Sequence, residues 1–225
     1  MRTKKAALLA ALAVILLTIT AGTLAYLTDT SKTVQNTFTV GQVKIKLTES
    51  TYDYKMEPGV PIDKDPVVTV EKGSLASWLF IEVAESEEAS LSEYIKYKIK
   101  TGERENEWHE MKEADVPDNV HVYYLKAPAV PEDAAKADTY HILAGGEYEY
   151  AYKPPEASET WTFTWGDDQV LVKPEVTRAM MEAIKPLGSI DPPTLTFKAY
   201  AVQLDGFEGP DGPLKAWQEA KKAAK

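Results

Sequence analysis

Three histidines are the only imidazole groups in this sequence of 225 residues, so the sites that need them can be checked one at a time. His109 lies in the segment WHEMKE, but a zinc-protease helix needs a second histidine four residues later, and that position is Glu113. His121 lies between two valines, and His141 follows Tyr140. Each is better explained as a surface or half-buried imidazole than as a metal ligand. The histidines therefore predict no metal site.

The other side chains that could do chemistry are no more specific. With 35 Asp and Glu residues, close pairs of carboxylates carry little information. Asp167 and Asp168 could bind calcium, but the spacing of an EF-hand loop is absent, and a tight turn after Gly166 explains them better. No serine lies in a Gly-x-Ser-x-Gly elbow, no phosphate-binding loop is present, and the chain has no cysteine. The sequence therefore predicts no catalytic residue, no cofactor and no enzyme.

Aromatic residues alternate with threonine in the segment TWTFTW. Tryptophan rings can stack on sugars, but Trp161 and Trp165 lie in step with Phe163, which favours packing in a core. The segment therefore predicts a strand with three buried rings. Exposure of Trp108 or Trp161 would instead favour carbohydrate binding.

The elements that must position these residues are mostly strands, because apolar residues recur with a period of two. Few helices are expected, because apolar residues recur every three or four positions only near residue 180 and at the C-terminus. The expected strands are 43–47, 66–70, 77–83, 94–100, 119–125, 148–152, 160–165, 168–173 and 194–204, and the expected helices are 176–184 and 212–225. Residues 160–165 and 168–173 are expected to form a hairpin around Gly166. The pattern predicts an antiparallel β-sandwich.

The N-terminus has the features of a secretory leader. A basic start, residues 2–5, precedes the apolar run 6–17, and small residues then allow cleavage between Ala25 and Tyr26. An uncleaved N-terminal anchor is the alternative. We therefore expect a signal peptide over 1–25, an N-terminal arm over 26–40 and one domain over 41–225. The formal net charge of −10 is a poor match for nucleic acid, so no such partner is expected.

Several segments together resemble the TasA/camelysin family of secreted proteins, which carry a SipW-dependent type of signal peptide. After the leader come a short segment with an aromatic residue and an aspartate, a Thr-Phe-Thr-x-Gly segment, and a strand of alternating apolar and polar residues. The similar segments are 26–29, 37–41, 43–47, 58–59, 64–70, 73–74, 78–81, 194–207 and 216–217. Residues 85–193 are less similar to that family.

The resemblance implies a jelly-roll-like β-sandwich with a few short helices, including one at the C-terminus, and export from a Gram-positive type of bacterium. It also implies a structural subunit that assembles with itself into extracellular fibres of a biofilm matrix. The arm would insert as a donor strand into the next copy, and the protein would meet signal peptidase and the membrane only through its signal peptide. The expected arm residues are Tyr26, Leu27, Thr28, Asp29, Thr30 and Val34.

Three alternatives stay open. The arm can be a frayed terminus or can fold back on its own domain. The protein can be a camelysin-like cell-surface metalloprotease, although no zinc pattern supports that activity. It can also be a monomeric surface adhesin or carbohydrate-binding module.

Overall fold

The computed structural model describes residues 26–28, 43–50, 53–86, 90–152 and 159–223, with the backbone alone for 26–28, 53–54 and 152. The fold is mostly β, and every ladder between described strands is antiparallel, as the sequence predicts. The described helices are α2 (Leu91–Tyr94), α3 (Arg178–Ala183) and α4 (Gly212–Ala223). The jelly-roll arrangement of these strands stays a prediction.

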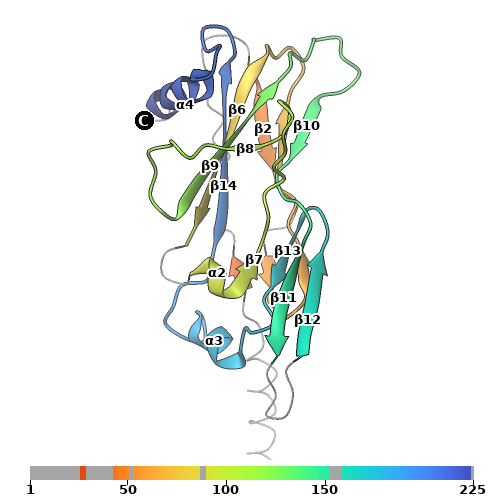
Figure 1. Cartoon of the computed structure of the whole chain (residues 1–225), viewed down its shortest axis with the longest axis vertical. Helices are drawn as coiled ribbons and strands as arrows, with labels where there is room; N and C mark the ends of the chain where they lie inside the picture. Colours follow the sequence, from red (N-terminus) through yellow and green to blue (C-terminus); the bar gives the residue numbers. More distant parts are fainter. Residues whose placement is uncertain (1–25, 29–42, 51–52, 87–89, 153–158, 224–225) are drawn as a thin grey trace, which may run out of the picture.

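The largest sheet, which we call the main sheet, has four strands (Figure 1). They are β6 (Ser77–Glu85), β8 (His109–Glu110), β9 (Val120–Ala127) and β14 (Leu195–Gln203). Their order is β14-β6-β9-β8, so β6 is central, as its nearly continuous apolar sequence predicts. The ladder between β6 and β14 joins segments more than 100 residues apart and covers every residue of both strands.

Both faces of the main sheet are covered. On β6, Leu79, Ile81 and Val83 point into the larger core, which also contains side chains of β2, β5 and β13. The alternate residue Phe80 points to the outer face and packs against Trp217 of α4, with ring centroids 5.6 Å apart. Figure 1 shows α4 beside the main sheet. A second, smaller apolar cluster lies between them.

The remaining strands form small sheets. One sheet contains β2 (Ile45–Thr48), β5 (Val67–Val70) and β10 (Asp138–His141). A second contains β4 (Pro61–Asp63), β13 (Gln169–Val172) and β7 (Ile95–Lys96). Two-stranded pairs are β11 (Gly146–Tyr152) with β12 (Glu159–Trp165), and β1 (Tyr26–Thr28) with β3 (Asp53–Lys55).

Local signals explain where the elements begin. In β2, Ile45 and Leu47 are buried and Lys46 is exposed, which is the predicted alternation. Helix α3 follows Thr177, whose side chain accepts a hydrogen bond from the backbone N–H of Met180 at 3.2 Å and so caps the first turn. Helix α4 has lysines in its last turn, where positive charge suits the helix dipole.

The expected hairpin between residues 160–165 and 168–173 is wrong. β12 pairs with β11, whereas β13 pairs with β4 and β7. Val170, Leu171 and Val172 are all buried, so both faces of β13 are covered. The two ladders place β4 on one edge and β7 on the other. The turn therefore carries the chain from one sheet into another.

The segment 94–100 is a strand only in part. Residues up to Tyr94 belong to α2, and the ladder of β7 contains Ile95 and Lys96 alone. Ile99 is buried and forms a single bridge with Leu143. The alternation thus predicts the buried face correctly but overstates the length of the strand.

The predicted leader, residues 1–25, and the arm residues Asp29, Thr30 and Val34 lie outside the described residues. The first arm residues form β1, which pairs with β3 of the same chain over three residue pairs, from Tyr26↔Lys55 to Thr28↔Asp53. Within the described parts of the chain, no helix has both the length and the apolar character needed to cross a membrane.

Candidate functional site

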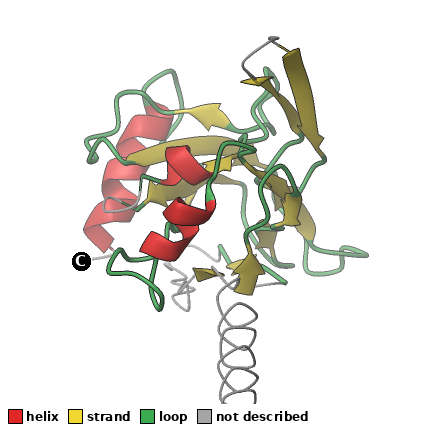
Figure 2. Cartoon of the chain, turned by 90° about the horizontal axis from the view of Figure 1, so that it is seen from below, coloured by secondary structure: helices red, strands yellow, loops and turns green. Residues whose placement is uncertain are grey.

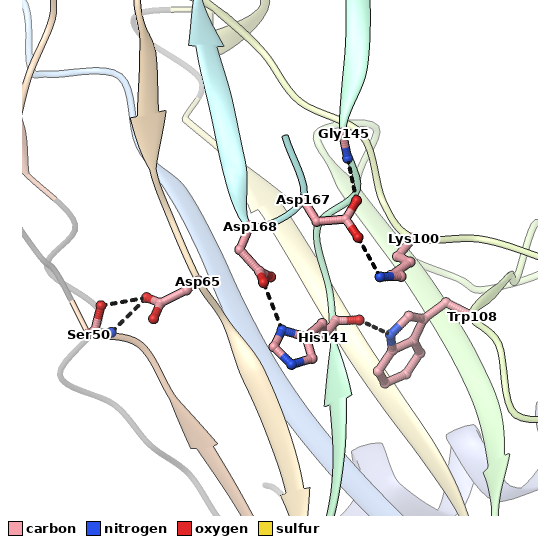
Figure 3. Close-up of polar contacts among 8 residues, drawn as sticks. All are labelled: Ser50, Asp65, Lys100, Trp108, His141, Gly145, Asp167 and Asp168. Atoms are coloured by element: carbon pink, nitrogen blue, oxygen red, sulfur yellow. Dashed lines mark hydrogen bonds and ion pairs between the residues drawn. The ribbon is translucent and has the colours of Figure 1, made fainter. Parts of the chain in front are cut away.

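A group of polar side chains gathers where the end of β10 meets the turn between β12 and β13, and we call it the junction cluster (Figure 3). It consists of His141, Asp167, Asp168 and Lys100. His141 is the last residue of β10, where it pairs with Val67 in the sheet. The sheet therefore fixes the imidazole beside a turn that comes from a different part of the chain.

The closest polar contact in the cluster joins His141 to Asp168. The imidazole Nδ1 lies 2.8 Å from Oδ2 of Asp168. Asp168 has a φ of 58°, a left-handed conformation that aspartate tolerates better than most residues. Its backbone carbonyl accepts a hydrogen bond from Lys64 N at 2.8 Å, so the turn is also tied to the end of β4. Among the described residues, no hydrogen-bond donor reaches the buried Oδ1 of Asp168.

The neighbouring carboxylate, Asp167, is held by two donors. Lys100 Nζ donates to Oδ2 at 2.7 Å, and the backbone N–H of Gly145 donates to Oδ1 at 2.9 Å. The hydrogen bond from Lys100 and the one from Gly145 together hold the pKa of Asp167 below its usual range. These two bonds favour the ionised form of Asp167 and tie the turn to Lys100 and Gly145.

The junction cluster can hold an imidazole in place, and its four members, all among the described residues, include no nucleophile. An aspartate that orients a histidine is one half of a hydrolase triad, and the other half is a serine on the far ring nitrogen. Ser50 instead donates its backbone N–H and its hydroxyl to Oδ1 of Asp65, at 2.8 and 3.0 Å (Figure 3). We therefore interpret the junction cluster as a structural brace.

The other two histidines lie elsewhere. His109 in β8 has its Nε2 2.9 Å from the carbonyl oxygen of Arg104, and its ring lies beside Tyr124 with centroids 5.5 Å apart. His121 in β9 has Nδ1 4.0 Å from Oε1 of Glu110. Throughout the described segments, no three His, Asp or Glu side chains gather closely enough to hold a metal ion.

The prediction that all three rings of TWTFTW are buried is wrong. Trp165 is buried and Phe163 is half-buried, but Trp161 is 48% exposed. Trp161 lies near the tip of the β11–β12 ribbon, opposite Tyr150, and Figure 2 shows this ribbon projecting from the body of the molecule. Trp108, the other ring whose exposure would favour sugar binding, is 2% exposed and donates its Nε1–H to the carbonyl of His141 at 3.0 Å.

No family model matches the chain, and neither a curated protein nor a solved structure matches it. Function is therefore inferred from the geometry and from the features of the sequence alone.

The sequence predicted the turn at Asp167 and Asp168 but not the contact between Asp168 and His141. These two residues are 27 positions apart. His141 ends β10, whereas Asp168 lies in the turn before β13, which belongs to another sheet. No motif spacing marks such a pair. The proposed cleavage site after Ala25 lies outside the described residues, and Tyr26 on its far side is the first residue of β1.

Proposed function

We propose that this protein is a secreted structural subunit with a jelly-roll-like β-sandwich, and that copies assemble into extracellular fibres by exchanging their N-terminal strands. In the single chain β1 pairs with β3 of the same molecule, which is the arrangement of the fold-back alternative. The proposal is supported by the way this contact is made. Extended residues directly after the predicted leader add to the edge of another strand through backbone hydrogen bonds. This is the type of contact that a donor strand makes.

The pairing is short enough to be exchanged. It contains three residue pairs, and β1 and β3 form a two-stranded sheet of their own. Two isolated strands are only marginally stable in water, so breaking this ladder costs little. The same backbone groups can pair with β3 of another copy, with the same register. When each arm joins the next copy, the contact is heterologous and does not close, and a filament results.

Engineered cysteines can distinguish pairing within one chain from pairing between chains, since the chain has no cysteine of its own. Leu27 lies opposite Tyr54 in the ladder. Neighbouring antiparallel residues have Cα atoms about 4.5–5.5 Å apart, a distance that a disulfide can bridge. We would purify the mature chain from Tyr26 onward with Leu27→Cys and Tyr54→Cys together, oxidise it at increasing concentration, and analyse it by non-reducing electrophoresis and electron microscopy.

The proposal predicts a ladder of disulfide-linked multimers from the double variant and filaments that carry these links. Mixing the two single variants should give a dimer. A matched control combines Leu27→Cys with Lys222→Cys, on the exposed side of α4, and should give no ladder. Monomers with an internal disulfide at every concentration, together with an absence of filaments, would show that the arm serves its own chain only.

A further inference from the structure

We propose that the outer face of the main sheet, beside the start of α4, carries a binding site for a neutral oligosaccharide. The site is a groove of three adjoining hollows, which we call the aromatic groove. His109 and Tyr124 line both the first and second hollows, and Glu105 and Lys126 line both the first and third. The second hollow also reaches over the edge strand β8, where Tyr123 from the inner side of β9 lines it. The shared residues place the three hollows next to one another, so a chain-like ligand would follow them in turn.

The first hollow, of about 240 Å³, has the walls that a sugar ring needs. Trp78 and Tyr124 form an edge-to-face pair with centroids 5.9 Å apart, and Tyr124 also lies against the ring of His109 at 5.5 Å. Pro210 and Pro213 also line this hollow. The C–H faces of a pyranose are apolar and pack on such rings, while its hydroxyl groups point outward.

These rings are held in place before any ligand binds. Trp78 donates its Nε1–H to the carbonyl of Phe207 at 2.9 Å, which fixes the indole against the loop that precedes α4. Tyr124 and Trp78 lie on neighbouring strands, β9 and β6, of the rigid main sheet. A preformed aromatic wall loses little conformational entropy on binding.

The polar groups along the aromatic groove favour an uncharged ligand. Its charged lining residues are three carboxylates and three ammonium groups, so they balance one another although the chain has a net charge of −10. These residues are Glu103, Glu105, Glu110, Lys98, Lys112 and Lys126. Donors and acceptors in equal number suit hydroxyl groups, which both donate and accept, better than they suit a ligand of one charge.

Size also favours a chain of sugar units. The second and third hollows measure about 650 and 310 Å³, so the aromatic groove extends well beyond one ring. The ion pair between Lys126 Nζ and Glu105 Oε2, 3.6 Å long, lies where the first and third hollows meet. Glu105 is 83% exposed there, so its carboxylate can turn toward a bound hydroxyl.

A peptide that adds as a strand is a poorer fit, because the backbone at the groove is already paired. Trp108, next to β8, forms a bridge with Thr101, and its carbonyl accepts a hydrogen bond from Gly102 N at 3.3 Å. The carbonyl of Glu105 accepts one from Lys126 N at 2.9 Å. The loop before β8 therefore covers the edge to which a new strand would add.

The test measures binding of four probes to the mature chain by isothermal calorimetry and tryptophan fluorescence. Two are neutral, cellotetraose and the tetramer of N-acetylglucosamine; one is acidic, tetragalacturonate; and one is a proline-rich decapeptide. The variants are Tyr124→Ala, Tyr124→Phe and the surface variant Glu105→Ala. Trp161→Ala serves as the matched control, since Trp161 is an exposed aromatic ring outside the aromatic groove. Circular dichroism establishes that each variant is folded.

We expect at least one neutral tetramer to bind, with affinity weakened about tenfold or more by Tyr124→Ala and changed less than about twofold by Tyr124→Phe, because the ring supplies the contact. Glu105→Ala should weaken binding severalfold, and Trp161→Ala should leave it unchanged. If Tyr124→Ala does not fold, the affinity of Glu105→Ala for the neutral tetramer tests the site in its place. The proposal is overturned if neither neutral tetramer binds, if only the acidic tetramer or the peptide binds, or if binding survives the groove variants and is lost in Trp161→Ala.

Discussion

The side chain of Glu82 joins α4 to the main sheet, and its substitution by glutamine tests how the outer layer is held. Glu82 lies on the outer face of β6 with 7% of its side chain exposed. Oε1 accepts a hydrogen bond from Lys198 of β14 at 3.1 Å, and Oε2 accepts one from Lys221 of α4 at 2.7 Å. One buried carboxylate is thus shared by two lysines from different elements.

The expected loss of stability follows from this geometry. Hydrogen bonds that involve a charged group contribute about 1.5–3 kcal/mol each. Lys198 and Lys221 are 40% and 39% exposed, so both regain water when the carboxylate is removed, which reduces the penalty. Glutamine also keeps one acceptor oxygen in place. We therefore expect Glu82→Gln to lower the free energy of unfolding by about 2 kcal/mol at neutral pH.

The loss should depend on pH with a definite sign. Burial raises the pKa of Glu82, but the hydrogen bonds and charges of Lys221 and Lys198 outweigh it, so the pKa lies below its ordinary value in the folded protein. The ion pair therefore stabilises the fold at pH values above the pKa that Glu82 has in the unfolded chain. This stabilisation is lost as the pH falls through the pKa that Glu82 has in the folded protein. The difference in the free energy of unfolding between the native chain and Glu82→Gln should therefore become smaller in acid.

Urea unfolding at about pH 7 and about pH 3 measures both effects. The matched control is Glu219→Gln, which removes an ion pair with Lys222 at 2.9 Å on the solvent side of α4. Glu219 is 47% exposed, so the control should change stability by less than about 0.5 kcal/mol. A difference for Glu82→Gln as small as that of the control, or one that stays constant with pH, would refute the reasoning.

Three further outcomes are expected. Thr177→Ala removes the N-cap of α3 and should cost about 1 kcal/mol in urea unfolding; an unchanged midpoint would show that the cap is not needed. Gly146→Ala places a Cβ 2.5 Å from the ring of Trp165 and should cost about 1–3 kcal/mol, visible as a lower melting temperature. Lys100→Met removes the strongest cause of the lowered pKa of Asp167, so that pKa should rise in an NMR titration of the carboxyl carbons; a pKa that does not move would assign the shift to other groups.

The spacing of apolar residues within single elements predicted much of the fold. The alternation in β2 and β5 and the apolar run of β6 follow from burial of one or both faces, and burial is a property of each strand by itself. The C-terminal helix was predicted for the same reason, and Trp217 packs on the main sheet as its spacing indicates.

Features that depend on contacts between distant segments could not be predicted in this way. The alternation of β12 is regular, but nothing in it shows that the strand continues into a ribbon where Trp161 is 48% exposed. The same limit applies to the partners of β13 and to the contact of His141 with Asp168. The aromatic groove likewise brings Trp78 and Tyr124 together from strands with unrelated sequence patterns.

The central strand β6 has a further consequence for how the molecule acquires its shape. One of its two neighbours, β14, is made more than 100 residues later, and α4 follows it. Until both have left the ribosome, β6 has an unpaired edge and Phe80 has no helix above it. Such long-range pairing slows folding and leaves one edge of β6 exposed in the nascent chain until β14 has been made. The main sheet is therefore complete only after β14 has been made, long after its central strand.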